Sequence, residues 1–152
     1  MVNVFLSLGS NLGDRRQQLI DAITLLSEKA GYIPAFSSFH ASSPWGFSSK
    51  HPFLNIAVQM VTTLSPFELL AVTQQIEREL GRTAKSHGSQ YADRLIDIDI
   101  LLYDDKVLQT PDLIIPHPLM HRRQFVLQPL AEIAPTQIHP VFHQTIAELL
   151  SL

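Results

Sequence analysis

The apolar residues of this chain follow two spacings, and each spacing predicts a different kind of element. Apolar runs or two-residue alternation predict strands over residues 2–9, 32–41, 53–63 and 94–103. Apolar residues three and four apart predict helices over about residues 14–30 and 65–81. The second of these opens on Ser65-Pro66-Phe67-Glu68, which has the pattern of a capping box. Gly31 and Gly81 are expected to end the two helices.

The predicted order of elements, β-α-β-β-α-β, is typical of a ferredoxin-like α+β sandwich in which helices cover an antiparallel sheet. Beyond it, residues 107–108 and 113–115 predict a small hairpin, and residues 122–133 and 144–150 predict short helices. We therefore expect a single domain, residues 1–152, with a C-terminal hairpin and helix extension. Many unrelated functions share this topology, so the fold alone indicates none of them.

The predicted strand near residue 100 carries two acids among apolar residues. Because strand residues alternate between faces, Asp97 and Asp99 share one face with Cα atoms roughly 6.5 Å apart. The opposite face is expected to hold Ile96, Ile98, Ile100 and Leu102. Two carboxylates this close repel each other unless a cation lies between them, and oxygen ligands suit Mg²⁺. An edge strand whose acids face water is the ordinary alternative, but the apolar neighbours and Arg94 favour a metal site for phosphoryl transfer.

The composition limits the classes of function. The 152 residues are 45% hydrophobic, which suits one domain with its own core, and the formal net charge is −3. That charge argues against general nucleic-acid binding. Seven of the eleven Lys and Arg residues nevertheless lie between Arg78 and Arg123, around the paired acids, which indicates a local site for a small phosphorylated ligand. The chain has no cysteine, which excludes thiolate metal sites, and no signal-peptide or membrane-spanning pattern, so we expect a cytoplasmic protein.

Several segments together resemble the 6-hydroxymethyl-7,8-dihydropterin pyrophosphokinase family of folate biosynthesis. The matching segments are residues 8–13, 43–46, 53–55, 74–82, 94–100 and 115–125. They cover nearly the whole chain in the right order and at compatible spacing. The most specific combination is Arg-x-x-Asp-x-Asp, beginning at Arg94, followed by Pro-His-Pro and Arg-x-Phe, which ends at Phe125.

The resemblance implies an enzyme that transfers the terminal pyrophosphoryl group of ATP to the hydroxymethyl oxygen of the pterin and releases AMP. Asp97 and Asp99 are expected to hold two Mg²⁺ ions against the triphosphate, as in the family. Arg82, Arg94 and Arg123 are expected to act with them in catalysis, since guanidinium groups grip two phosphate oxygens at once. The remaining residues that the resemblance places at ATP are Gln74, Glu77, Lys85, Ile100 and His117. A solvated helix surface is the ordinary alternative for the first two.

The resemblance also implies a pterin pocket. A pterin is flat and has an amide-like edge, so it calls for aromatic rings on its faces and for groups that donate and accept hydrogen bonds. Phe53 and Asn55 share a predicted strand face, and a carboxamide does both. The resemblance adds Phe125 on the opposite side of the ring, and it adds a loop made of Ser43, Pro44, Trp45 and Gly46. Without the resemblance, core packing would be the ordinary role for the two Phe residues, and a turn would be the ordinary place for Asn55.

The loop at residues 83–93 departs from the family pattern. It has one Lys and one His where members often carry several arginines, and Tyr91 stands in place of a tryptophan. The roles of those arginines are therefore not transferred, and we expect more of the phosphate neutralisation from Mg²⁺, Lys85 and Arg123. This loop and residues 43–52 are expected to close over both substrates.

Two alternatives belong to other classes of function. A nucleic-acid-binding module of this topology places aromatic residues on its central strands, where this chain places acids. A non-catalytic ligand-binding module has no need for paired acids beside arginines. We therefore expect small-molecule substrates, no nucleic acid, no membrane, and a monomer or weak homodimer.

Overall fold

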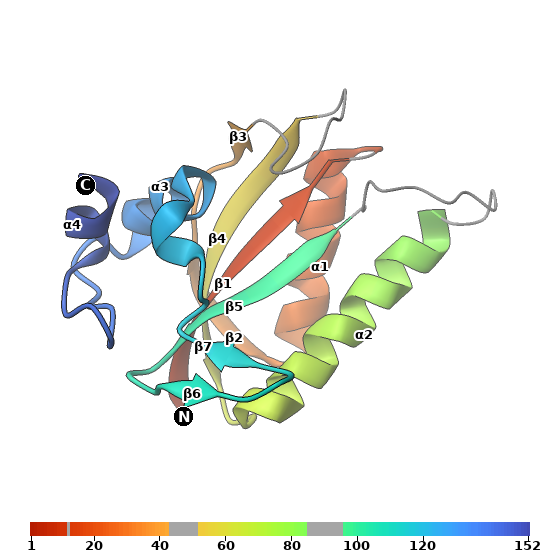
Figure 1. Cartoon of the computed structure of the whole chain (residues 1–152). Coiled ribbons are helices and arrows are strands. Elements are labelled where there is room, and N and C mark those ends of the chain that lie inside the picture. Colours follow the sequence, from red (N-terminus) through yellow and green to blue (C-terminus); the bar gives the residue numbers. More distant parts are fainter. Residues whose placement is uncertain (12, 43–51, 85–95) are drawn as a thin grey trace.

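An antiparallel sheet forms the centre of the computed structural model, which describes all residues except 12, 43–51 and 85–95 (Figure 1). Its strands are β1 (Val2–Ser10), β2 (Gly31–Phe36), β3 (His40–Ser42), β4 (Phe53–Thr62) and β5 (Asp97–Tyr103). The strand order is β2-β4-β1-β5, and β3 pairs with β4. Every neighbouring pair is antiparallel. This is the predicted ferredoxin-like α+β arrangement.

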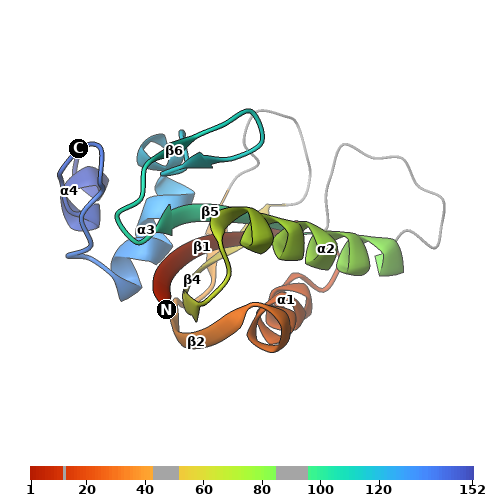
Figure 2. The same cartoon turned by 90° about the horizontal axis from the view of Figure 1, so that it is seen from below.

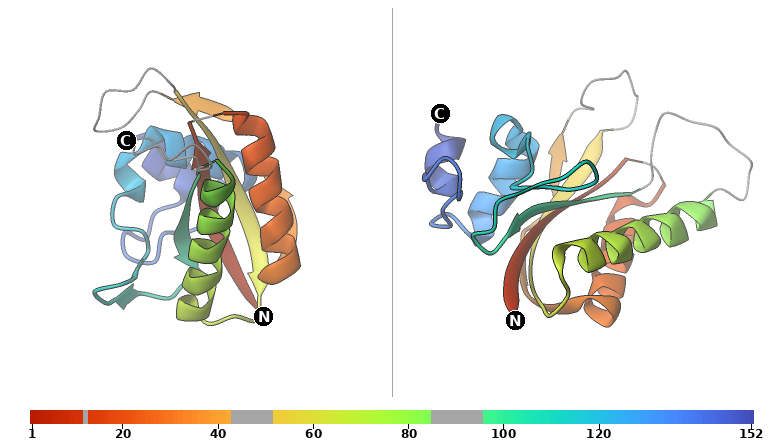
Figure 3. Two further views of the ribbon diagram at one scale, coloured as in Figure 1. Left: turned by 90° about the vertical axis from the view of Figure 1, so that its right-hand side faces the viewer. Right: turned by 60° about the horizontal axis from the view of Figure 1, so that its bottom comes forward.

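Two helices, α1 (Arg15–Lys29) and α2 (Pro66–Ala84), cover one face of the sheet (Figures 1 and 3). The predicted capping box is present at the start of α2, because the Ser65 N–H donates to Glu68 and the Glu68 N–H donates to Ser65 Oγ. The apolar sides of both helices and of the strands form the first core. Its fully buried side chains include Leu6, Leu8, Leu19, Leu26, Ile56, Met60, Leu69 and Ile76. No helix of the described residues is long and apolar enough to cross a membrane.

The C-terminal extension reaches the opposite side of the sheet with its helices (Figure 2), although Leu113 and Ile115 near its start pack in the first core. It consists of β6 (Leu108–Gln109), β7 (Ile114–Ile115), the 3₁₀ turn η2 (Met120–Arg122), α3 (Gln124–Ile133) and α4 (Ile146–Leu150). The strands β6 and β7 form the predicted hairpin. A second core lies beneath α3 and α4, and it contains Phe5, Ala57, Leu101, Leu102, Met120, Val126, Leu127, Leu130, Ile146 and Leu149.

A bulge in β5 changes which way its later side chains face. Phe5 pairs with Leu102 and the next β1 residue pairs with Ile100, so Leu101 is an extra residue in the ladder. Ile96, Ile98 and Ile100 face the first core as predicted. The prediction that Leu102 shares their face was wrong: it packs in the second core, because the extra residue reverses the alternation.

Other boundaries also differ from the prediction. Residues 32–41 do not form one strand, because the ladder is irregular around Pro34, which has no N–H to donate, and residues 37–39 separate β2 from β3. The helix α2 runs through Gly81 to Ala84 instead of ending there. The helix α1 ends just before Gly31, as predicted, and Gly31 begins β2, where a Cβ atom would clash with the Val61 carbonyl oxygen, so close backbone approach explains this glycine.

Candidate functional site

The sheet face that carries the second core becomes polar toward the end of β1. Residues that are paired across neighbouring strands point to the same face, so the strand pairing shows which side chains form a row across the sheet. Ser7 pairs with Ala57 and Asp99, and Gly9 pairs with Asn55 and Asp97. We call this region the polar sector; it consists of Ser7, Gly9, Phe53, Asn55, Asp97 and Asp99. One end of the face thus packs against α3, and the other presents polar groups.

Gly9 separates the two sides of the polar sector. A Cβ atom at this position would lie 3.0 Å from Asn55 Oδ1 and 3.4 Å from the Phe53 ring. Phe53 and Asn55 therefore project on the same face, as the strand spacing predicted. A glycine inside a strand often marks such close approach, and here it lets Asn55 and the Phe53 ring lie close to β1.

The strand that carries the two acids is held along its outer edge. The Ile98 N–H donates to Glu77 Oε2 at 2.6 Å, and the His117 N–H donates to the Leu101 carbonyl oxygen at 2.9 Å. Edge strands otherwise leave such groups unpaired. The half-buried side chains of Asp97 and Asp99 are therefore presented from a strand whose outer edge is fixed by α2 near its start and by the segment after β7 near its end.

His117 lies close to Asp99 and to Arg123. Burial lowers the pKa of His117, the Asp99 carboxylate opposes this shift, and the Arg123 guanidinium adds to it. The Leu119 N–H donates to His117 Nδ1 at 3.2 Å, so the neutral ring carries its proton on Nε2. Arg123 Cζ lies 5.6 Å from the centre of the Phe125 ring, a distance typical of a cation–π contact. A ring N–H donor therefore lies beside Asp99, followed by the cation of Arg123 and the aromatic ring of Phe125.

The Asn55 side chain is oriented by hydrogen bonds from its nitrogen. Asn55 Nδ2 donates to Ser42 Oγ at 2.7 Å and to the His40 carbonyl oxygen at 3.3 Å. Both hydrogens of the amide therefore have partners within β3. The carbonyl oxygen lies on the side of Gly9, where it can accept a hydrogen bond from a ligand.

Comparison with known proteins gives the family. The model of the 7,8-dihydro-6-hydroxymethylpterin-pyrophosphokinase (HPPK) family matches residues 5–135. The 2-amino-4-hydroxy-6-hydroxymethyldihydropteridine pyrophosphokinase of Porphyromonas gingivalis is 51% identical over 142 residues, which cover 92% of this chain and 95% of that protein. The protein of the same name from Bacillus subtilis is 46% identical over 130 residues, covering 85% of this chain and 76% of that protein. The chain belongs to the HPPK family.

Solved structures show the same fold. An HPPK-DHPS protein in complex with substrates aligns with a TM-score of 0.77 and 15% identity, covering 99% of this chain and 43% of that one. The wild-type HPPK-DHPS of Plasmodium falciparum with SDX-DHP aligns with a TM-score of 0.74 and 18% identity, covering 99% of this chain and 43% of that one. The chain thus spans less than half the length of these solved chains.

Three of the residues expected at ATP in an HPPK protein lie on α2 and β5. Gln74 is exposed on α2, whereas Glu77 bonds to the outer edge of β5. The Ile100 side chain is 4% exposed in the first core. Its main chain points to the outer edge of β5, because alternate strand residues point their N–H groups the same way and Ile98 donates outward to Glu77. Ile100 can therefore contact a ligand only through its backbone.

Several predicted site residues lie where the structure does not describe them. Arg82 belongs to α2, but its side chain is outside the described part. The others lie in residues 43–51 and 85–95 and are Ser43, Pro44, Trp45, Gly46, Lys85, Tyr91 and Arg94. Their predicted roles stay predictions.

The polar sector fits the Mg²⁺ that we expect in an HPPK protein. Asp97 and Asp99 supply two half-buried carboxylates on one strand face. Among the described residues, no group of three or more His, Cys, Asp or Glu could hold a metal ion. Mg²⁺ typically binds one or two carboxylates and completes its shell with water and phosphate oxygens, so this donor set suits it.

Proposed function

We propose that the chain transfers the terminal pyrophosphoryl group of ATP to the hydroxymethyl oxygen of 6-hydroxymethyl-7,8-dihydropterin, releasing AMP, with Mg²⁺ held by Asp97 and Asp99. The observation that carries the proposal is the row Asn55–Gly9–Asp97. Two strand spacings, about 10 Å, separate the amide from the acids across this row, which is a suitable distance for a pterin edge and its reacting arm. The Porphyromonas gingivalis relative carries the name of this activity.

The pterin half of the proposed site is built on β4. The Asn55 oxygen accepts a hydrogen bond from the N–H groups of the pterin edge, because its nitrogen already donates to β3. Phe53 and Phe125 lie on the β4 and α3 sides of the pocket and stack on the pterin ring. Offset stacking of this kind contributes about 0.5–1.5 kcal/mol beyond the burial of area.

The nucleotide half is built on the outer edge of β5. Arg123 and the Nε2–H group of His117 donate to phosphate oxygens beside Asp99, and the Ile100 backbone offers main-chain groups to the nucleotide. Glu77 keeps this strand in place through its bond to Ile98. In the reaction, the pterin oxygen bonds to the β-phosphorus while the bond from that phosphorus to the α,β-bridging oxygen breaks. The bridging oxygen leaves with AMP, and the hydroxyl proton is released to solvent. Bound Mg²⁺ supplies neutralisation of the phosphate charge, which is the main requirement of such transfers.

The proposal includes further features of the enzyme. It acts on small molecules as a single domain, in the cytoplasm, as a monomer or weak homodimer, and it uses two Mg²⁺ ions. Sedimentation at several concentrations checks the assembly, and titration of activity against Mg²⁺ checks the metal. The relatives' names favour catalysis over a non-catalytic binding module.

A product assay tests the proposed function. The purified chain is incubated with ATP, Mg²⁺ and the hydroxymethyl-dihydropterin, and nucleotides are separated by chromatography. AMP should form only when the pterin and Mg²⁺ are both present. Formation of ADP, or AMP without the pterin, would exclude pyrophosphoryl transfer.

A further inference from the structure

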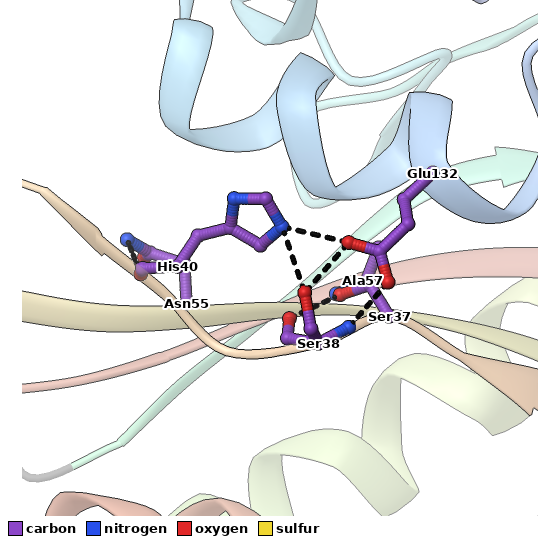
Figure 4. A network of polar contacts seen from close by, with 6 residues as sticks. All are labelled: Ser37, Ser38, His40, Asn55, Ala57 and Glu132. Atoms are coloured by element: carbon purple, nitrogen blue, oxygen red, sulfur yellow. Dashed lines mark hydrogen bonds and ion pairs between the residues drawn. The ribbon is translucent and has the colours of Figure 1, made fainter.

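A carboxylate far from the acids of β5 joins the two walls of the proposed pterin pocket. Glu132, near the end of α3, accepts hydrogen bonds from the Ser38 N–H at 2.7 Å, the Ser38 hydroxyl at 2.7 Å and the His40 ring nitrogen Nε2 at 2.9 Å (Figure 4). Ser38 and His40 belong to the segment that leads from β2 into β3. The contact thus spans more than 90 positions of sequence between α3 and the sheet.

The position of Glu132 is not explained by its own helix. The partial negative charge at the end of a helix disfavours an acid in the last turn, and the last turn of α3 contains no basic residue to offset it. The three donors from Ser38 and His40 compensate this carboxylate instead. The acid therefore serves the contact with β3 and not the stability of α3 alone.

The same segment orients Asn55. The His40 carbonyl oxygen accepts from Asn55 Nδ2, and the two residues are paired in the β3–β4 ladder. Just before Ser38, the Ser37 N–H donates to the Ala57 carbonyl oxygen and the Ala57 N–H donates to Ser37 Oγ, which fixes the segment on β4. The His40 ring thus bonds to Glu132, and the His40 backbone bonds to Asn55, the residue proposed to bind the pterin edge.

The opposite wall of the pocket is carried by α3 itself. Phe125 lies in the first turn of this helix, and Arg123 is the residue just before the helix. Val126, Leu127 and Leu130 anchor α3 on the sheet through apolar contacts, which have no direction of their own. The hydrogen bonds of Glu132 are directional, so they fix how far the helix lies from β3.

We propose that Glu132 is a positioning residue for the pterin pocket, because it sets α3, with Phe125, against β3, which orients the Asn55 carboxamide. This inference rests on the proposed function of the polar sector. Glu132 touches neither substrate. It acts on pterin affinity through the relative placement of Phe125 and Asn55, while the nucleotide half on β5 is held by separate contacts from Glu77 and His117.

The test compares substrates in matched variants. Glu132→Ala removes all three acceptor contacts, and Glu132→Gln keeps the size but replaces one acceptor oxygen with a donor. Gln128→Ala is the control, because Gln128 is exposed on the same helix. We expect the dissociation constant and KM for the pterin to rise about tenfold in Glu132→Ala, since hydrogen bonds to a charged group are lost. The KM for ATP should stay within about twofold. Gln128→Ala should match the wild type in both.

A partner variant separates positioning from general stability. His40→Phe removes one donor to Glu132 and keeps the backbone of β3. Its effect on pterin affinity should be less than additive with Glu132→Ala, because the two side chains act through one contact. All binding is measured well below the melting temperature of each variant. If Glu132→Ala does not fold, Glu132→Gln and His40→Phe carry the same comparison.

The outcomes distinguish this inference from the proposed function. Unchanged pterin affinity in folded Glu132 variants would overturn the inference alone, as would equal losses for the pterin and ATP. Wild-type protein that does not bind the pterin would overturn the proposed function, and the inference with it.

Discussion

The two ends of one sheet face differ in what their side chains do. At one end Phe5, Ala57 and Leu102 pack beneath α3 and α4 in an apolar core. At the other end the same strands present the polar sector, with Gly9 between Asn55 and the two acids. The bulge at Leu101 lies near the boundary between them. The core end thus holds the fold together, while the polar end carries the proposed binding site.

The comparison predicts opposite effects of substitution at the two ends. A change in the polar sector should reduce activity and leave stability nearly unchanged, because few apolar contacts depend on it. A change in the second core should reduce stability and leave the activity of the folded protein nearly unchanged.

Removing one acid of the polar sector should have the largest effect. Asp97→Asn or Asp99→Asn should lower turnover by about 10³-fold, because the site then lacks half of its charge for Mg²⁺. Pterin affinity should stay largely intact, and the melting temperature should not fall, since one of two neighbouring like charges is removed. Rapid-quench measurement of AMP formation checks this.

The matched control for the acids is Asp105→Asn, in the exposed turn after β5. It should leave turnover and melting temperature unchanged. Equal loss of pterin binding in the Asp97 or Asp99 variants would indicate that the acids are structural, which contradicts the comparison.

Truncating the second core should affect stability. Ile146 is 0% exposed at the start of α4, so Ile146→Ala should reduce the free energy of unfolding by about 2–5 kcal/mol. Ile138→Ala is the control, because Ile138 is 54% exposed and its truncation removes little packing. Urea denaturation measures both. A folded Ile146→Ala protein that loses turnover as severely as an acid variant would break the division between the two ends.

Adding a side chain at Gly9 should weaken pterin binding. A Cβ atom in Gly9→Ala would lie 3.0 Å from Asn55 Oδ1, so the amide must move, and we expect pterin affinity to fall about tenfold. Gly81→Ala is the control, because a Cβ atom there meets none of the described residues within 4 Å and the position is helical. Calorimetric titration of the pterin distinguishes the two variants. Equal affinities in both would place the pterin away from this row.

The smallest effect concerns pH. The hydrogen bonds from His40 and Ser38 lower the pKa of Glu132 below its usual 4.5. A pKa that is lower in the folded state than in the unfolded state stabilises the fold at pH values above the unfolded-state pKa. This stability is lost as the pH falls through the folded-state pKa. The difference in melting temperature between wild type and Glu132→Gln should therefore be largest near neutral pH and shrink in acid. The titratable group that faces Glu132 is His40. If the wild type loses no more stability than Glu132→Gln on acidification, the result would contradict this contact.

Local patterns predicted much of the fold and part of the site. The fixed geometry of helices and strands predicts the capping box at Ser65. It also predicts that Phe53 and Asn55 share a strand face, and that Asp97 and Asp99 share one. The bulge at Leu101 could not be predicted, because bulges depend on how strands pair. The contact of Glu132 with His40 likewise joins residues whose proximity only the folded chain creates.

The most direct test of the central claim is a crystal structure with the pterin, Mg²⁺ and an ATP analogue that cannot be cleaved between the α- and β-phosphorus atoms. The account predicts Mg²⁺ between the phosphates and the carboxylates of Asp97 and Asp99, with the pterin edge at Asn55. A triphosphate bound elsewhere, with no ion at the two acids, would contradict it.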